Sequence, residues 1–249
     1  MQIIAQPYTF TAADRQRIEA LGYRIEGIPT DRQLENFVPA LFPNFDLAGL
    51  LEMVDKLFAP TTPLAIQRRI QYNIPAETLH FIFRNSTANE DEAVAFDRVV
   101  LRQGGELLIK HMYCLVPLPY QGKGLIKPIF QASLQQYVNM GVWKIMVHAG
   151  LGGGGYTWAR HGFVAVEPNE VQTILNDAYN KLSANEITPV ERIFSKYYSD
   201  HPAGAEFPMI LWASLPGMKE VLRGADWNGS LDLHNPEQFR NFSNYVFRP

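Results

Sequence analysis

Four residues at 121–124, Gln-Gly-Lys-Gly, form the best candidate for a binding loop in this sequence. They follow a predicted strand at 106–116 and precede a predicted helix at 126–140. Glycine lets the backbone approach a ligand, and the free N–H groups of a helix start favour an anion such as a pyrophosphate. The loop lacks the Gly-Lys-Ser/Thr end of a Walker loop and the third glycine of a dinucleotide fingerprint. Taken alone, it is better explained as a turn that starts a helix without a ligand.

Two histidines could move a proton near neutral pH, because imidazole titrates in that range. His111 lies inside the predicted strand 106–116, and His148 ends a predicted strand at 143–148, next to the glycine run 152–155. Functional sites gather where strands open into loops, which favours a functional role for His148. For His111, a catalytic role and a hydrogen-bonded place in the core fit the sequence equally well.

Other reactive side chains are more simply explained by packing or solvation. Cys114 lies in an apolar strand without a paired base, which indicates a buried thiol rather than a nucleophile. Asp97 and Glu106 are expected to be surface charges near a turn, and His161 a solvated residue at the end of a short helix. Arg98 could attract an anionic substrate or simply be exposed. No histidine pair has His-x-x-x-His spacing, so no metal is expected.

Helices separated by prolines are predicted for the first third of the chain. Thr11 can cap the first helix, 31–38 form a second that stops at Pro39, and Asp46 can cap a third. From residue 79 the pattern changes to strands, with a hairpin turn at 103–105 that predicts an antiparallel pair. The predicted strands are 79–83, 93–102, 106–116, 143–148 and 162–166, and the predicted helices after residue 120 are 126–140, 156–160, 170–182, 188–198, 216–222 and 236–245.

From Leu79 to Val166 the sequence resembles the GCN5-related N-acetyltransferase superfamily. The central motif of that family is a strand, then Gln/Arg-x-x-Gly-x-Gly/Ala, then a helix. A further strand and a short helix ending in Gly-Phe follow in the family, as 143–148 and Gly162-Phe163 do here. The residues that match the central motif are Gln121, Gly122, Lys123, Gly124 and Leu125, whereas Ile126 stands where a small residue is usual.

This resemblance implies an α/β (α+β) fold with a mixed, mostly antiparallel sheet flanked by helices. Two parallel central strands would splay into a V that holds the pantetheine arm of a coenzyme A thioester. An acyl-carrier protein could present the same arm, so acetyl-CoA, longer acyl-CoA and carrier-bound phosphopantetheine all stay open as donors. The resemblance places the arm on the backbone of Cys114, Val116 and Leu118 and the pyrophosphate on the loop formed by Gln121, Gly122, Lys123, Gly124, Leu125 and Ile126.

The chain departs from the family at two positions. The usual general acid is a Tyr four residues before the Gly of Gly-Phe, and that position is Trp158 here. Tyr156 could replace the missing phenol if the glycine-rich loop shifts the short helix by half a turn. The bulk of Ile126 could crowd the phosphate, which favours a carrier-protein donor or an altered pose of CoA.

The composition is that of an ordinary folded protein, with 249 residues of which 47% are hydrophobic and 19% charged. The 22 Lys+Arg and 25 Asp+Glu residues give a net charge of −3, so no basic face for nucleic acid is expected. One cysteine excludes an intramolecular disulfide. The sequence has neither an apolar run of about 18 residues, as a membrane span needs, nor a signal-peptide pattern, and a reducing cytoplasm is the expected location.

We predict three segments: a helical part of the domain at 1–78, the donor-binding core at 79–168, and a helical extension at 169–249 that could bind the acceptor. The resemblance implies an N-acyltransferase that moves an acyl group to an amine by direct attack in a ternary complex. The added segments suggest a peptide or protein acceptor. The alternative is a non-catalytic binding or scaffold protein with this fold, for which Trp158 in place of Tyr is the best argument.

Overall fold

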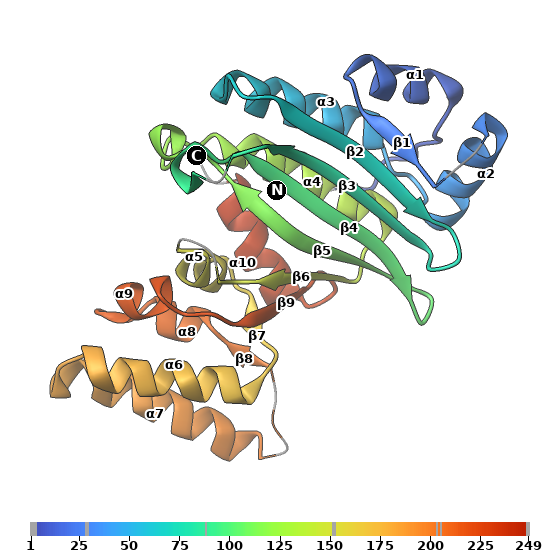
Figure 1. Ribbon diagram of the computed structural model, residues 1–249. Helices are drawn as coiled ribbons and strands as arrows, with labels where there is room; N and C mark the ends of the chain where they lie inside the picture. The colour runs from blue at the N-terminus through green and yellow to red at the C-terminus, as the bar shows by residue number, and fades with distance from the viewer. Residues whose placement is uncertain are drawn as a thin grey trace. The chain divides into compact units, whose positions relative to one another are not determined.

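The computed structural model describes residues 4–27, 30–87, 89–150, 153–202, 204 and 206–247. The chain divides into two compact units, Met1–Trp143 with Val246–Pro249, and Lys144–Tyr245. Both combine helices with mostly antiparallel strands (Figure 1), so the predicted mixed α/β fold is confirmed. Within the described ranges no helix has the length and apolar character to cross a membrane.

The first unit contains a five-stranded sheet in the order β1-β2-β3-β4-β5. Among the strand pairs described in it, β1–β2 is parallel and the others are antiparallel. The β4–β5 hairpin confirms the turn predicted at 103–105, and it contains a β-bulge: Asp97 pairs with Tyr113 and Arg98 with His111, which leaves Met112 as an extra residue in β5. The strands are β1 (Arg24–Glu26), β2 (Ile66–Asn73), β3 (Thr78–Asn85), β4 (Ala95–Gln103) and β5 (Glu106–Leu115).

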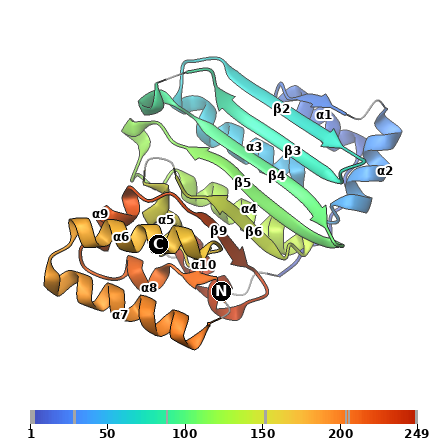
Figure 2. The same ribbon diagram turned by 60° about the horizontal axis from the view of Figure 1, so that its bottom comes forward.

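Helices cover one face of this sheet, whereas none of the helices described for the first unit lies over the other face (Figures 1 and 2). The apolar side of α3 packs against the covered face: Phe58 lies 6.1 Å from Phe83 and 6.4 Å from Phe96, ring centroid to ring centroid. Asp46 caps α3 as predicted, because its carboxylate accepts the Gly49 N–H at 2.8 Å. The helices are α1 (Ala12–Ala20), α2 (Asp31–Leu41), α3 (Leu47–Phe58) and α4 (Ile126–Met140), with 3-10 turns at Ala59–Thr61, Glu90–Glu92 and Leu118–Tyr120.

The second unit contains four strands in the order β6-β9-β7-β8, all antiparallel to their neighbours. Helices α6 and α7 pack side by side in this unit (Figures 1 and 2). The strands are β6 (Lys144–His148), β7 (Val164–Ala165), β8 (Phe207–Pro208) and β9 (Asn228–Asp232), and the helices are α5 (Gly154–Arg160), α6 (Pro168–Lys181), α7 (Ala184–Asp200), α8 (Ile210–Ala213), α9 (Met218–Arg223) and α10 (Pro236–Phe247).

Three details of the sequence prediction need correction. The segments expected to be helical also contain β1 and β2 before residue 78, and β8 and β9 after residue 169. Helix α2 does not stop at Pro39 but continues to Leu41, because the missing N–H of this proline removes a single hydrogen bond near the helix end. Helix α7 begins at Ala184 rather than 188, because Ser183 and Glu186 form a capping box.

Candidate functional site

The loop at 121–124 leads into the 15-residue helix α4 without a side-chain cap. Gly122 and Gly124 have φ angles of +71° and +76°, a region that suits glycine. A Cβ added to either glycine would meet no atom within 4 Å, and both glycines are exposed. The space beside this backbone is therefore open to a ligand.

The N–H groups of the loop are available to an acceptor. In the part of the chain that the structure describes, no backbone acceptor is found for the N–H groups of residues 122–126. Leu125 and Ile126 are half-buried at the first turn of α4, while Lys123 is exposed with its Nζ 5.9 Å from the Tyr120 ring. Amides without a backbone acceptor at a helix start suit a phosphate group.

The strand before the loop ends earlier than predicted. Strand β5 stops at Leu115, and Leu118 lies in a 3-10 turn instead of extending the strand. The Val116 carbonyl accepts a hydrogen bond from Gln121 Nε2 at 2.9 Å, so this group is already paired. Cys114 is half-buried, and burial raises the pKa of its thiol, against the opposing effect of Arg98. The family resemblance predicts a splay between β5 and β6. These strands belong to different units, and the splay stays a prediction.

Arg98 is fully buried in the core of the first unit, which corrects the expectation of an exposed or substrate-facing cation. Its Nη1 donates to the carbonyls of Tyr113 at 2.6 Å and Asp97 at 2.8 Å, and its guanidinium lies 4.1 Å from the Phe96 ring centroid. The Tyr113 carbonyl belongs to the bulge in β5, where the regular ladder is interrupted. Arg98 therefore stabilises the backbone near the end of β5, the strand that precedes the candidate loop.

His111 lies on β5 in the core and contacts side chains of α4. Its Nε2 is 3.0 Å from the Tyr137 hydroxyl, and its ring stacks on Phe130. Burial, helped by the charge of Arg98, lowers the pKa of His111 well below its ordinary value, so the ring is neutral. This geometry fits the core interpretation of His111, and we leave it out of the proposed chemistry.

His148 stands at the exposed end of β6 with an acceptor opposite each ring nitrogen. Its Nε2 is 3.1 Å from Asp226 Oδ1 and its Nδ1 is 3.2 Å from Asn228 Oδ1. Glu170 fixes the orientation of the Asn228 amide by accepting from its Nδ2 at 2.7 Å. When the ring is protonated, its two N–H groups can donate to these two acceptors. His148 is therefore a candidate proton donor.

Tyr156 is half-buried in α5 and has two cations near its ring. Arg160 Cζ lies 5.7 Å and Lys219 Nζ 5.9 Å from its ring centroid. Trp158 points into the core instead, where it packs edge-on against Phe163 at 5.0 Å between ring centroids. Tyr156 is thus the phenol of α5 that remains within reach of a ligand.

The glycine run 152–155 overlaps the start of α5, and one of its glycines is required for packing. Gly155 is buried against the chain end of α9, where an added Cβ would lie 2.8 Å from the Ala225 carbonyl oxygen and closer still to that of Leu222. Gly153 is the N-cap of α5 with φ +95°. Leu151 and Gly152 lie outside the described residues, so the half-turn shift that this glycine-rich loop could give the short helix stays a prediction.

His161 is buried, and the expectation of a solvated residue was wrong. It follows α5 directly and stacks on Tyr245 with 3.3 Å between ring centroids. Burial, with a smaller effect of Arg160, lowers its pKa to about 3. The ring is therefore neutral in the folded unit at neutral pH.

Acid should destabilise the protein partly through His161. The unfolded chain binds a proton on this residue below its ordinary pKa of about 6.5, whereas the folded chain does not until about 3, so stability falls as pH drops between these values. We expect His161→Phe, which keeps the ring stack, to reduce this loss by on the order of 1 kcal/mol per pH unit. Urea unfolding at pH 7, 6, 5 and 4 measures it. The exposed His234→Gln is the control, and equal slopes for both variants would contradict the assignment.

A carboxylate–imidazole pair on the first unit was not indicated by the sequence. His80 Nε2 on β3 is hydrogen-bonded to Asp97 Oδ1 on β4. Asp97 is 3% exposed, so its prediction as a surface charge near a turn was wrong. The two residues are 17 positions apart, and only the β3–β4 register brings them together.

No group of three or more His, Cys, Asp or Glu side chains arranged to hold a metal ion occurs within the described ranges. Comparisons of the chain with protein-family models, with curated proteins and with solved structures give no match.

Proposed function

We propose that this chain is an N-acyltransferase similar to the GCN5-related N-acetyltransferase superfamily. Its donor would be acetyl-CoA, a longer acyl-CoA or the phosphopantetheine thioester of an acyl-carrier protein, and its acceptor an amine of a peptide or protein. The acyl group would pass by direct attack in a ternary complex. A coenzyme A donor and a single cysteine outside any disulfide fit a location in the cytoplasm.

The observation that carries this proposal is the open loop at the start of α4. Two glycines with positive φ, N–H groups from 122 to 126 without a backbone acceptor and open space at both Cα atoms support a pyrophosphate site here. The order of elements supports it as well: β5, the loop, α4, β6, the short α5 and β7 follow one another as the family resemblance implies.

The residues would share three tasks. The N–H groups of Gly122 to Ile126 hold the phosphates, and the backbone around Cys114 lies along the pantetheine arm. Tyr156 donates a proton to the departing thiolate, and His148, when protonated, is a second group able to deliver one. The donor supplies the activated thioester.

Calorimetry and thiol release test the proposal together. Calorimetric titrations with acetyl-CoA, a longer acyl-CoA and an acyl-phosphopantetheine without adenosine identify the donor that binds. Release of free thiol in the presence of an amine then measures transfer. A chain that binds none of the three donors would refute the proposal.

Replacing Tyr156 with Phe should slow turnover by about 100-fold, because a positioned general acid contributes on this order. Donor affinity should stay unchanged, because the ring and its two cation contacts remain. The exposed Tyr179→Phe on α6 is the matched control. If the Tyr156 variant turns over at the normal rate, this residue is not the acid.

A non-catalytic binding or scaffold protein is the second candidate. It is favoured by two observations: Trp158 occupies the usual acid position and is buried, and His111 is enclosed in the core. Such a protein would bind a donor in calorimetry and release no thiol with any amine.

A further inference from the structure

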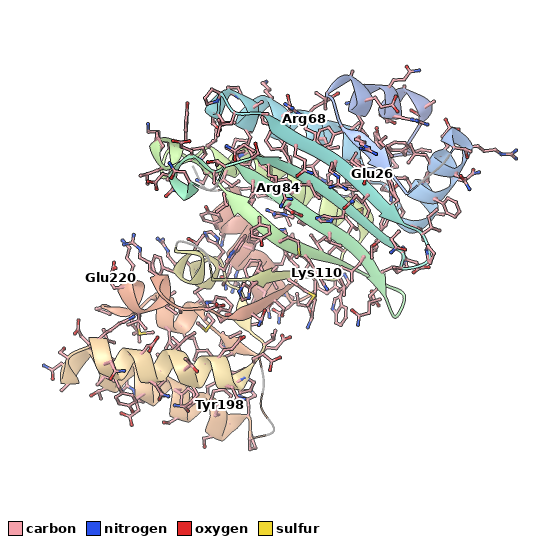
Figure 3. The ribbon with its side chains drawn as sticks, viewed as in Figure 1. Glu26, Arg68, Arg84, Lys110, Tyr198 and Glu220 are labelled. Atoms are coloured by element: carbon pink, nitrogen blue, oxygen red, sulfur yellow. The ribbon has the colours of Figure 1, made fainter. Side chains whose placement is uncertain are left out.

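The His80–Asp97 pair lies on the face of the β1–β5 sheet opposite to α3 and α4. Side chains alternate between the two faces of a strand, and Phe81 and Phe96 directly follow and precede these two residues. Phe81 packs against Phe45 just before α3, Phe96 packs against Phe58 of α3, and the two rings contact each other. Figure 3 shows Glu26, Arg84 and Lys110 on this same open face. In the register, His80 lies in one row with Gln71, Val99 and Lys110.

The pair is built like the base and its orienting carboxylate in acyl-transfer enzymes. An ionised Asp97 can only accept, so His80 donates to it from Nε2, and in the neutral ring the lone pair then lies on Nδ1. Within the ranges described, Nδ1 has no hydrogen-bond partner, and the His80 side chain keeps 29% exposure. Nδ1 can therefore accept a proton from a bound molecule.

The His80–Asp97 pair lies beside β5, the strand that the proposed donor would follow. Asp97 is directly opposite Tyr113 in β5, and Tyr113 is 43% exposed beside the Met112 bulge. Bulges redirect side chains and commonly border functional sites. The carboxylate Glu26 on the same face is already paired with Arg69 at 2.8 Å and Gln71 at 3.0 Å, so it is less suited than His80 to take up a proton.

We propose that His80, oriented by Asp97, removes the proton from a primary ammonium group of the acceptor, and this inference rests on the proposed acyltransferase function. One proton of the ammonium passes to His80 Nδ1 and then to solvent. The free amine forms the N–C bond with the thioester carbonyl carbon, the C–S bond breaks, and the second proton ends on the thiolate sulfur. The products are an amide and a free thiol.

Nucleophiles that differ in protonation test this assignment. His80→Gln keeps an amide that can donate to Asp97 but cannot accept a proton. With acetyl-CoA and poly-L-lysine, we expect kcat to fall by about 10²- to 10⁴-fold, with acetyl-CoA affinity unchanged in calorimetry. With hydroxylamine, whose nitrogen is unprotonated at neutral pH, the rate should stay near that of the unaltered protein. Asp97→Asn should lower kcat with poly-L-lysine in the same direction, and His234→Gln should leave both rates unaltered.

The outcomes separate the two proposals. A normal rate of His80→Gln with poly-L-lysine, or an equal loss with both nucleophiles, would overturn the role of His80 while leaving the acyltransferase proposal standing. Absence of binding of acetyl-CoA, of the longer acyl-CoA and of the acyl-phosphopantetheine, with no thiol release to either nucleophile in the unaltered protein, would overturn both.

Discussion

Replacing Gly124 with glutamate is expected to abolish donor binding. The new side chain would enter the open space beside the loop, and its carboxylate would occupy the position where free N–H groups favour an anion. The carboxylate would repel a phosphate of the donor, and the side chain would occupy the space that the phosphate needs. The change should remove detectable heat in calorimetry with acetyl-CoA, which means an affinity loss of at least about 100-fold.

The same helix offers a matched control at its other end. Gly141 follows α4 in the left-handed region with φ +70°, and an added Cβ there also meets no atom within 4 Å. Gly141→Glu therefore carries the same backbone strain, and its charge lies at the unfavourable C-terminal end of the helix dipole, whereas the carboxylate of Gly124→Glu lies at the favourable end. The Gly141 variant should be the less stable protein and still bind the donor. If both variants lose the donor equally, the loop is not its site.

Local sequence signals were sufficient for the elements that frame this loop. The Asp46 cap, the turn at 103–105 and the helix predicted at 126–140 each depend on local sequence, and each was found where predicted. Such signals depend on neighbours in sequence, and distant partners do not alter them.

Two of the strands that the sequence missed, β2 and β9, are polar and depend on their partners. Strand β2 has the sequence Ile-Gln-Arg-Arg-Ile-Gln-Tyr-Asn, and only Ile70 and Tyr72 are buried. Strand β9 contains Gly229 and Ser230 and is held from both sides, because Ser230 pairs with Met146 of β6 and with Val164 of β7. Cross-strand pairing stabilises such segments more than their own propensity does.

The candidate site also has a part that local sequence predicts and a part that depends on distant residues. The open loop could be predicted because glycines and a helix start are local features. The burial of Asp97, Arg98 and His161 could not, because each polar side chain enters the interior with a partner from a distant segment or its own backbone: His80, the Tyr113 carbonyl and the Tyr245 ring, respectively. Charged residues are rarely buried without such a partner, and the partner cannot be inferred from the neighbouring sequence.

Gly155→Ala is expected to destabilise the second unit, by about 3 kcal/mol or more, because the methyl group would press on the backbone carbonyls of Leu222 and Ala225. Backbone atoms cannot move aside as a side chain can. Gly154→Ala, one residue earlier in α5, should do the opposite: its Cβ would lie 3.7 Å from the nearest atom, an ordinary contact, and Ala in a helix is favoured over Gly by about 0.5–1 kcal/mol. Urea unfolding measures both. Changes of the same sign would mean that α5 does not pack against the end of α9, and Tyr156, one residue further on, would then lose the position assigned to it.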